Sequence, residues 1–121
     1  MHIFSKEKAG KPKTSHDEEI YELLGRDFDQ KTENHSVAHV VIPSRKESRL
    51  HRHPKPEESY YILKGHARIT IGEEKAEITT GQIVLIPPTK PHKIENIGDV
   101  DLEFLAICVP AWEPNNTEFL K

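Results

Sequence analysis

Two histidines, two glutamates and two tyrosines lie close together in the stretch HRHPKPEESYYILKG, residues 51–65. His51 and His53 are two residues apart, so on a β-strand both imidazoles project from the same face. Two prolines then force a turn, after which Glu57 or Glu58 begins a strand that can return antiparallel beside the first. A carboxylate from that second strand can therefore reach both imidazoles.

A third histidine follows another proline-rich turn, in the stretch IPPTKPHKIEN. His92 shares strand parity with the apolar Ile94, whereas Lys93 and Glu95 alternate onto the other face, so His92 is expected to point inward. Three imidazoles and a carboxylate buried as free polar groups would lose their hydration without gaining a partner. A divalent cation bound between them removes that cost.

The ligand types narrow the choice of metal. Imidazoles with a single carboxylate and no thiolate favour Mn, Fe, Co, Ni, Cu or Zn over Ca or Mg, and they leave coordination positions for water or a small-molecule ligand. Ligand type alone leaves the identity within that group open. The competing interpretation is structural, because a single His-x-His pair is more often a surface or packing feature than a metal site.

Further residues are candidates for lining the site. Tyr60 and Ile62 share parity with Glu58 and are expected to face the cavity, where Tyr60 either orients a ligand or is a core aromatic with a partnered hydroxyl. Gln82, at the start of its strand, is expected at the rim. Cys108 is interpreted as a small buried hydrophobe.

Short strands separated by proline and glycine must position these side chains. Eight segments of this kind follow one another, which predicts an all-β sandwich or closed barrel over residues 36–109. They are residues 36–43, 49–53, 59–64, 66–71, 75–79, 82–87, 92–96 and 102–109.

The two ends of the chain are expected to differ from this barrel. In residues 1–35 the sequence predicts a polar arm followed by a short helix over 16–24. The helix is expected because Ser15 and Glu18 have the spacing of a capping box and Gly25 follows as a stop. Residues 110–121 form a proline-rich tail with Trp112 and Phe119, which we expect to pack on the barrel or on a second subunit.

The spacing of the first histidine cluster resembles that of the cupins. Their first motif is Gly, five residues, His-x-His, three or four residues, Glu, six residues and Gly. His51, His53, Glu58 and Gly65 fall at those positions, while Arg45 stands where the leading Gly would be. The gap to Gly65 selects Glu58 over Glu57 as the carboxylate ligand.

The second cupin motif is Gly, five residues, Pro-x-Gly, two residues, His, three residues and Asn. Gly81, Pro87, His92 and Asn96 fit it, with Thr89 in place of the middle Gly. The two replaced glycines affect the expected turn geometry and leave the ligand positions unchanged. The resemblance implies a cupin double-stranded β-helix, or jelly-roll barrel, with His51, His53, Glu58 and His92 as ligands of one divalent transition metal.

The same resemblance implies a function without fixing the reaction. Cupins of this layout include dioxygenases, decarboxylases and sugar-phosphate isomerases, and residues 84–105 are similar to the closing part of cupin-type phosphomannose isomerases. The first hypothesis is therefore a metal-dependent enzyme acting on a small organic molecule. The alternatives are a non-catalytic, metal-dependent module that binds a small molecule or sugar, and a purely structural barrel.

Composition excludes several other classes. The formal net charge of −3 leaves no excess of basic residues for a phosphate backbone, so neither nucleic acid nor a membrane surface is an expected partner. The absence of a signal-like apolar run, together with a single cysteine, favours the cytoplasm. A homodimer is expected, because the outward Tyr61 and Leu63, residues 102–109 and Trp112 supply more apolar surface than one small barrel needs to cover.

Overall fold

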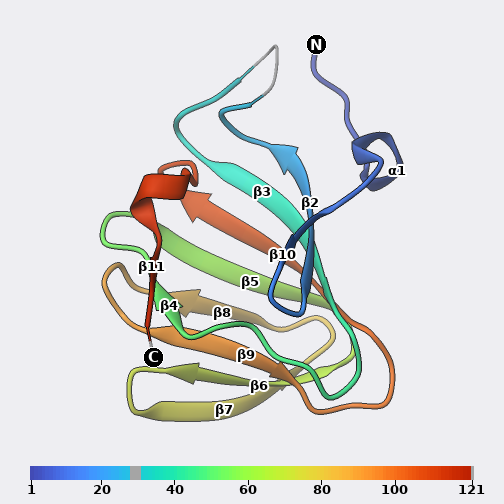
Figure 1. The fold of residues 1–121 in the computed structure, drawn as a ribbon, viewed down its shortest axis with the longest axis vertical. Coiled ribbons are helices and arrows are strands. Elements are labelled where there is room, and N and C mark those ends of the chain that lie inside the picture. Colours follow the sequence, from blue (N-terminus) through green and yellow to red (C-terminus); the bar gives the residue numbers. More distant parts are fainter. Residues whose placement is uncertain (28–30, 121) are drawn as a thin grey trace.

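The computed structural model describes residues 1–27 and 31–120. Two antiparallel sheets pack against each other, with the strand orders β1-β2-β3-β10-β5-β8 and β11-β4-β9-β6-β7 (Figure 1). The prediction of an all-β fold is confirmed. The elements are α1 (Lys6–Ala9), β1 (Lys13–Ser15), β2 (Glu18–Leu24), β3 (Ser36–Ile42), β4 (His51–Arg52), β5 (Glu57–Lys64), β6 (His66–Ile71), β7 (Glu74–Thr79), β8 (Ile83–Ile86), β9 (His92–Asn96), β10 (Leu102–Val109), the 3-10 helix η1 (Pro114–Asn116) and β11 (Glu118–Phe119).

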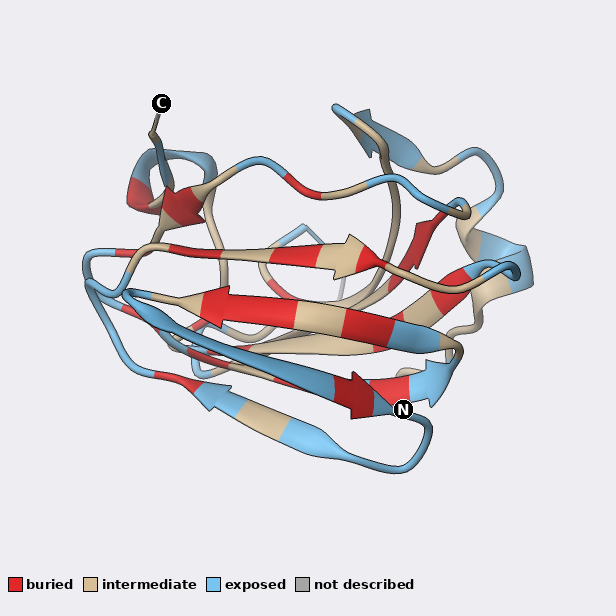
Figure 2. Cartoon of the chain, turned by 90° about the horizontal axis from the view of Figure 1, so that it is seen from below, coloured by how far each residue is buried: buried red, intermediate tan, exposed pale blue. Residues whose placement is uncertain are grey.

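The hydrophobic core lies between the two sheets, and strand alternation decides which side chains enter it. Along β5, Glu58, Tyr60 and Ile62 are buried, whereas Tyr61 and Leu63 lie on the outer face. Buried and more exposed residues alternate along several strands of the two sheets (Figure 2). The buried hydrophobic cluster also includes Phe104 of β10, together with residues of β6, β7 and β9 in the opposite sheet. Glu58 therefore lies on the core-facing side of its strand, in line with two large buried residues.

The helix predicted over residues 16–24 is wrong. Residues Glu18–Leu24 form strand β2, which pairs antiparallel with β3 and places Ile20 opposite Val40. The edge of β3 offers a full row of backbone partners, and this tertiary pairing outweighs the capping-box pattern. The short helix of the protein is α1, in a stretch that the sequence indicated as a loose arm; Ser5 caps it by accepting a hydrogen bond from the Lys8 backbone N–H.

The eight predicted strands are present. Strands β6, β9 and β10 have the predicted bounds, while β4 is shorter than expected and β5 begins earlier, at Glu57. Strands β1, β2 and β11 were not predicted. The last of them, β11, pairs with β4 so that Phe119 lies opposite His51, and it brings the C-terminal tail beside the histidines. No helix formed by the described residues has the length and hydrophobicity needed to cross a membrane.

Two turns keep a left-handed backbone without the expected glycine. Arg45 and Thr89 stand at the two motif positions where glycine was replaced, and their φ angles are 65° and 73°. Interactions at each turn hold this conformation: Arg45 donates to the Ile97 carbonyl and pairs with Asp99, and the Thr89 backbone N–H donates to the His53 carbonyl. The replaced glycines therefore leave the turn geometry unchanged.

Gly65, by contrast, is required by both its conformation and its surroundings. Its φ is +99°, and an added Cβ would lie 3.1 Å from both the Asp101 carbonyl oxygen and the Leu102 Cα. Gly65→Ala is expected to lower the free energy of unfolding by about 2 kcal/mol. The matched control is Gly72→Ala, where φ is +59° and the Cβ would meet open space. Denaturant unfolding of both variants checks this, and equal losses for the two would contradict it.

Candidate metal centre

Four side chains from two sheets meet at one point inside the barrel. The ligand atoms of His51, His53, Glu58 and His92 all lie within 4.8 Å of one another, and all four residues are buried. His51 on β4 pairs directly with His92 on β9, and Glu58 reaches them from β5 of the other sheet. Residues far apart in the sequence are thus brought together by the packing of the two sheets.

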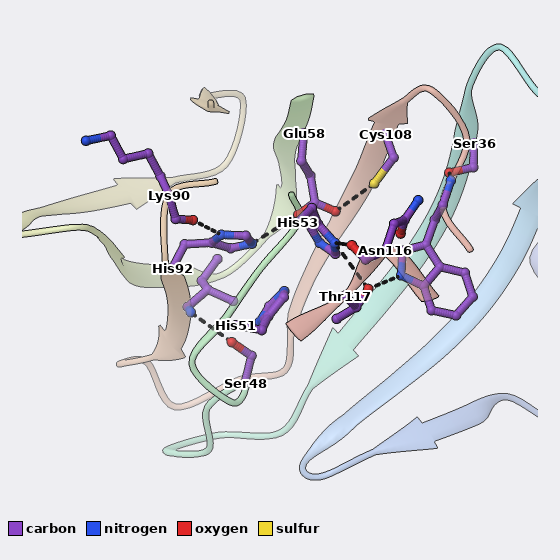
Figure 3. A network of polar contacts seen from close by, with 12 residues as sticks. Ser36, Ser48, His51, His53, Glu58, Lys90, His92, Cys108, Asn116 and Thr117 are labelled. Atoms are coloured by element: carbon purple, nitrogen blue, oxygen red, sulfur yellow. Dashed lines mark hydrogen bonds and ion pairs between the residues drawn. The ribbon is translucent and has the colours of Figure 1, made fainter. Parts of the chain in front are cut away.

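Backbone carbonyl groups orient the three imidazoles. The Nδ1 atoms of His51, His53 and His92 lie 2.7, 3.0 and 3.0 Å from the carbonyl oxygens of Arg49, Asn116 and Lys90. Figure 3 shows the contacts of His53 with Asn116 and of His92 with Lys90. A carbonyl oxygen only accepts, so each Nδ1 carries the donated hydrogen. In the neutral ring this leaves Nε2 with a free lone pair. Such bonds are the usual means by which proteins orient histidine ligands of a metal.

Glu58 lies between two of these rings. Its Oε1 is 3.1 Å from His92 Nε2 and 3.2 Å from His53 Nε2, and its Oε2 accepts a hydrogen bond of 3.1 Å from the Cys108 thiol. Burial raises the pKa of Glu58, but its bonds and charge interactions with His53 and His92 outweigh burial and hold the pKa well below its usual range. Glu58 is therefore a carboxylate, the form that ligates metals.

The donor set fits a divalent transition metal. Burial, followed by the charge of His92, lowers the pKa of His51 to about 4, so this ring is neutral near pH 7. Burial of Cys108, and then the Glu58 charge, raise the pKa of the thiol, which keeps it protonated. Three imidazole nitrogens and one carboxylate oxygen remain as donors, a combination that favours this class of ion without selecting one member.

Two of the three histidines lie on the wall of a cavity of about 310 Å³. His51, His53, Glu58 and Tyr60 line it, while His92 is fully buried outside the lining. Tyr60 hydrogen-bonds to Glu58, and burial, followed by that negative charge, raises the pKa of its hydroxyl. Tyr60 is therefore a neutral donor that positions the carboxylate.

Two other expectations about the cavity lining are corrected. Ile62 is fully buried in the hydrophobic core and does not line the cavity, because the core closes over β5 beyond Tyr60. Gln82 also lies outside the lining: it is exposed, and its side-chain oxygen accepts a hydrogen bond from the Thr79 backbone in the turn between β7 and β8.

The structure adds an acidic residue that sequence reasoning missed. Glu18 begins β2 and lines the same cavity, where burial, followed by the charge of Glu58, raises its pKa to about 7. As part of a predicted helix, Glu18 was interpreted as a capping residue. Glu18 and Ile20 are two residues apart, and on a strand this spacing would have placed Glu18 on the same inward face as Ile20. On a helix the same spacing has no such meaning.

Metal affinity is expected to fall as the pH is lowered. In the metal-free protein burial lowers the pKa of His53, but the hydrogen bonds that its ring donates to Glu58 and to the Asn116 carbonyl, with the negative charge of Glu58, outweigh burial and raise the pKa above its usual 6.5. Below that pKa the ring holds a proton that a metal must displace, so affinity drops by about tenfold per pH unit for each displaced proton. Manganese titrations from about pH 8.5 to about pH 5.5 check this, and an affinity independent of pH would contradict it.

Comparison with known proteins places the chain in a family. The cupin domain profile matches residues 38–108. The uncharacterized protein MJ1618 of Methanocaldococcus jannaschii is 42% identical over 86 residues, which are 71% of this chain and 69% of that protein. The oxalate-binding protein of Thermotoga maritima is 33% identical over 72 residues, which are 60% of each chain.

Among solved structures, the oxalate decarboxylase of Lactobacillus farciminis in complex with formate superposes with a TM-score of 0.79 and 28% identity. The superposition covers 91% of this chain and 33% of the decarboxylase, so the chain spans about a third of that protein. These similarities confirm the double-stranded β-helix, or jelly-roll, architecture expected from the two sequence motifs. The chain belongs to the cupin family.

Proposed function

We propose that the protein is a metal-dependent enzyme acting on a small organic molecule, with His51, His53, Glu58 and His92 holding one divalent transition metal. The observation that carries the proposal is the convergence of these four donors, with every imidazole tied at Nδ1 to a backbone carbonyl. Buried polar groups arranged in this way have little structural use, since an apolar cluster of the same size would be at least as stable.

The bound metal would supply Lewis-acid polarisation of a substrate oxygen, or redox chemistry. Glu18 supplies the proton-transfer group that the sequence alone did not identify. A carboxyl group with a pKa of about 7 exchanges its proton readily at neutral pH, and this one lines the same cavity as His51, His53 and Glu58. This supports reactions that move a proton, decarboxylation and isomerisation, over dioxygenation.

A second function is supported by one comparison. The oxalate-binding protein of Thermotoga maritima matches more than half of this chain. The same metal centre in this chain would then retain a small molecule without converting it, and Glu18 would only donate a hydrogen bond.

Turnover assays on the metal-loaded protein distinguish the two. A panel of keto acids, diols and sugar phosphates is incubated with the manganese-, iron- and zinc-loaded forms, with and without oxygen, and products are followed by mass spectrometry. The enzyme proposal expects product from the parent and little from Glu18→Gln at equal metal content. Metal-dependent binding with no product from any compound would favour the binding module.

We also propose that the protein is a cytoplasmic homodimer. Support for the dimer comes from the outer face of β5 and β8, where Tyr61 is 37% exposed and its cross-strand partner Ile83 is 62% exposed. Light scattering is expected to give twice the 13.9 kDa of one chain, and Ile83→Lys is expected to give the monomer. The control is Val100→Lys, in the loop between β9 and β10. A monomeric parent at micromolar concentration would contradict the dimer.

A further inference from the structure

The cavity beside the metal centre is larger than a ligand such as oxalate requires. Its volume of about 310 Å³ corresponds to about ten water molecules at about 30 Å³ each, whereas oxalate has only six non-hydrogen atoms. Most of its wall away from the histidines is apolar. The apolar wall includes Ile20, Leu24, Ala38, Val40, Ala106 and Trp112.

The charges of the lining also disfavour a small dianion. Among the described lining residues the cations are Lys13 and Arg26, and both already have acidic partners. Lys13 Nζ lies 2.9 Å from Glu22 Oε1 and 3.9 Å from Asp27. Arg26 pairs with Glu113 at 3.5 Å and with Glu33 at 3.6 Å, and it donates to the Ala111 carbonyl.

Acidic side chains outnumber Lys and Arg among the described residues that line the cavity. Glu18, Glu22, Asp27 and Glu58 all line the cavity. A second carboxylate that extended away from the metal centre would therefore meet acidic lining residues, with no unpaired Lys or Arg among the described ones, at a cost in desolvation and repulsion. A neutral apolar group in the same position would instead be removed from water against Ile20 and Trp112, which is favourable.

We infer that the ligand is a small amphipathic molecule, with an oxygen-bearing head that approaches the metal centre and an aromatic or branched aliphatic body that lies against the apolar wall. The inference rests on the proposed metal site and specifies its substrate class. The ligand class differs from oxalate, which appears in the names of two of the similar proteins.

Matched ligand pairs test the inference. The manganese-loaded protein is titrated calorimetrically with acetohydroxamate and benzohydroxamate, with pyruvate and phenylpyruvate, and with oxalate. The two members of each pair share a head group and differ in the apolar body. The difference in their affinities therefore measures the contribution of contacts with the apolar wall. The phenyl member of each pair is expected to bind at least about tenfold more tightly than its partner, and more tightly than oxalate.

Two variants locate the preference. Ala38→Phe fills the apolar wall from β3, and Ile20→Ser makes it polar from β2. Each is expected to retain its metal content and to reduce the preference for the phenyl ligand to less than about threefold. Metal content and circular dichroism establish that a variant is folded, and one folded variant of the two is sufficient for the test.

The outcomes separate this inference from the proposed function. Bound metal together with equal affinities within each pair, tighter binding of oxalate, or no binding of any probe would overturn the ligand class and leave the metal site standing. A parent protein that binds no manganese, iron or zinc would overturn the metal site and the inference that rests on it.

Discussion

Replacing His92 by alanine is expected to lower the affinity for a divalent transition metal by about 100-fold or more. The substitution removes one of four donors, whereas loss of an outer partner of a ligand already costs about 10- to 100-fold. His92 is fully buried and its Nε2 faces Glu58, so no solvent-exposed group can take its position without rearrangement of the barrel. Competition with a fluorescent chelator measures the affinity.

The control for this variant is His66→Ala. The His66 side chain is 52% exposed on β6, where it pairs with Glu77, and it lies outside the four-residue cluster. The metal affinity of His66→Ala should equal that of the parent protein. If His92→Ala retained parental affinity while remaining folded, the metal would have to bind elsewhere, and the cluster would be a structural network of hydrogen bonds.

Replacing Glu18 by glutamine is expected to stabilise the metal-free protein by about 2 kcal/mol at about pH 8, and to have little effect at about pH 4. The pKa of Glu18 is about 7 in the folded protein against 4.5 for the ordinary group. Between these values the folded chain keeps a proton that the unfolded chain has lost, so the stability of the parent falls as the pH rises through this window. Glutamine does not titrate, and the variant avoids that loss.

Urea unfolding at several pH values measures this difference on chelator-treated protein. Glu19→Gln is the control, because Glu19 follows on the same strand and alternates onto the opposite face. Its stability relative to the parent should not change across the window. A Glu18→Gln effect of the same size at both ends of the pH range would show that Glu18 carries no raised pKa.

The metal cluster was largely predictable from the sequence because strand alternation and motif spacing are local. His51 and His53 share a face by parity, and the apolar Ile94 beside His92 indicates which way that ring points. The choice of Glu58 over Glu57 depended on the distance to Gly65, and the structure agrees: Glu58 is buried whereas Glu57 is exposed. The same alternation correctly indicated the outward Tyr61.

The parts that could not be predicted depend on contacts between distant segments. Residues 18–24 carry the markers of a helix, and only the open edge of β3 makes them a strand. The wrong assignment concealed Glu18, because its side chain faces the cavity only through that pairing. The Asn116 carbonyl that orients His53 comes from the tail, 63 residues further along the chain, and no local pattern signals it.

The alternation rule also overreached at two positions. It placed Ile62 on the same face as Glu58, which is correct, but it did not indicate where the cavity ends and the packed core begins. Gln82 lies in a turn, where strand alternation does not apply. Its side-chain oxygen accepts a hydrogen bond from the Thr79 backbone N–H, and this bond holds the side chain at the surface. Parity gives the face of a residue, and tertiary packing decides what that face contacts.

Anomalous diffraction from crystals of the manganese-loaded protein, recorded on both sides of the metal absorption edge, tests the central claim most directly. We expect one strong peak at about 2.0–2.3 Å from Nε2 of His51, His53 and His92 and from a carboxylate oxygen of Glu58. A peak that lies elsewhere, or a map in which these four side chains close on one another with no metal between them, would contradict it.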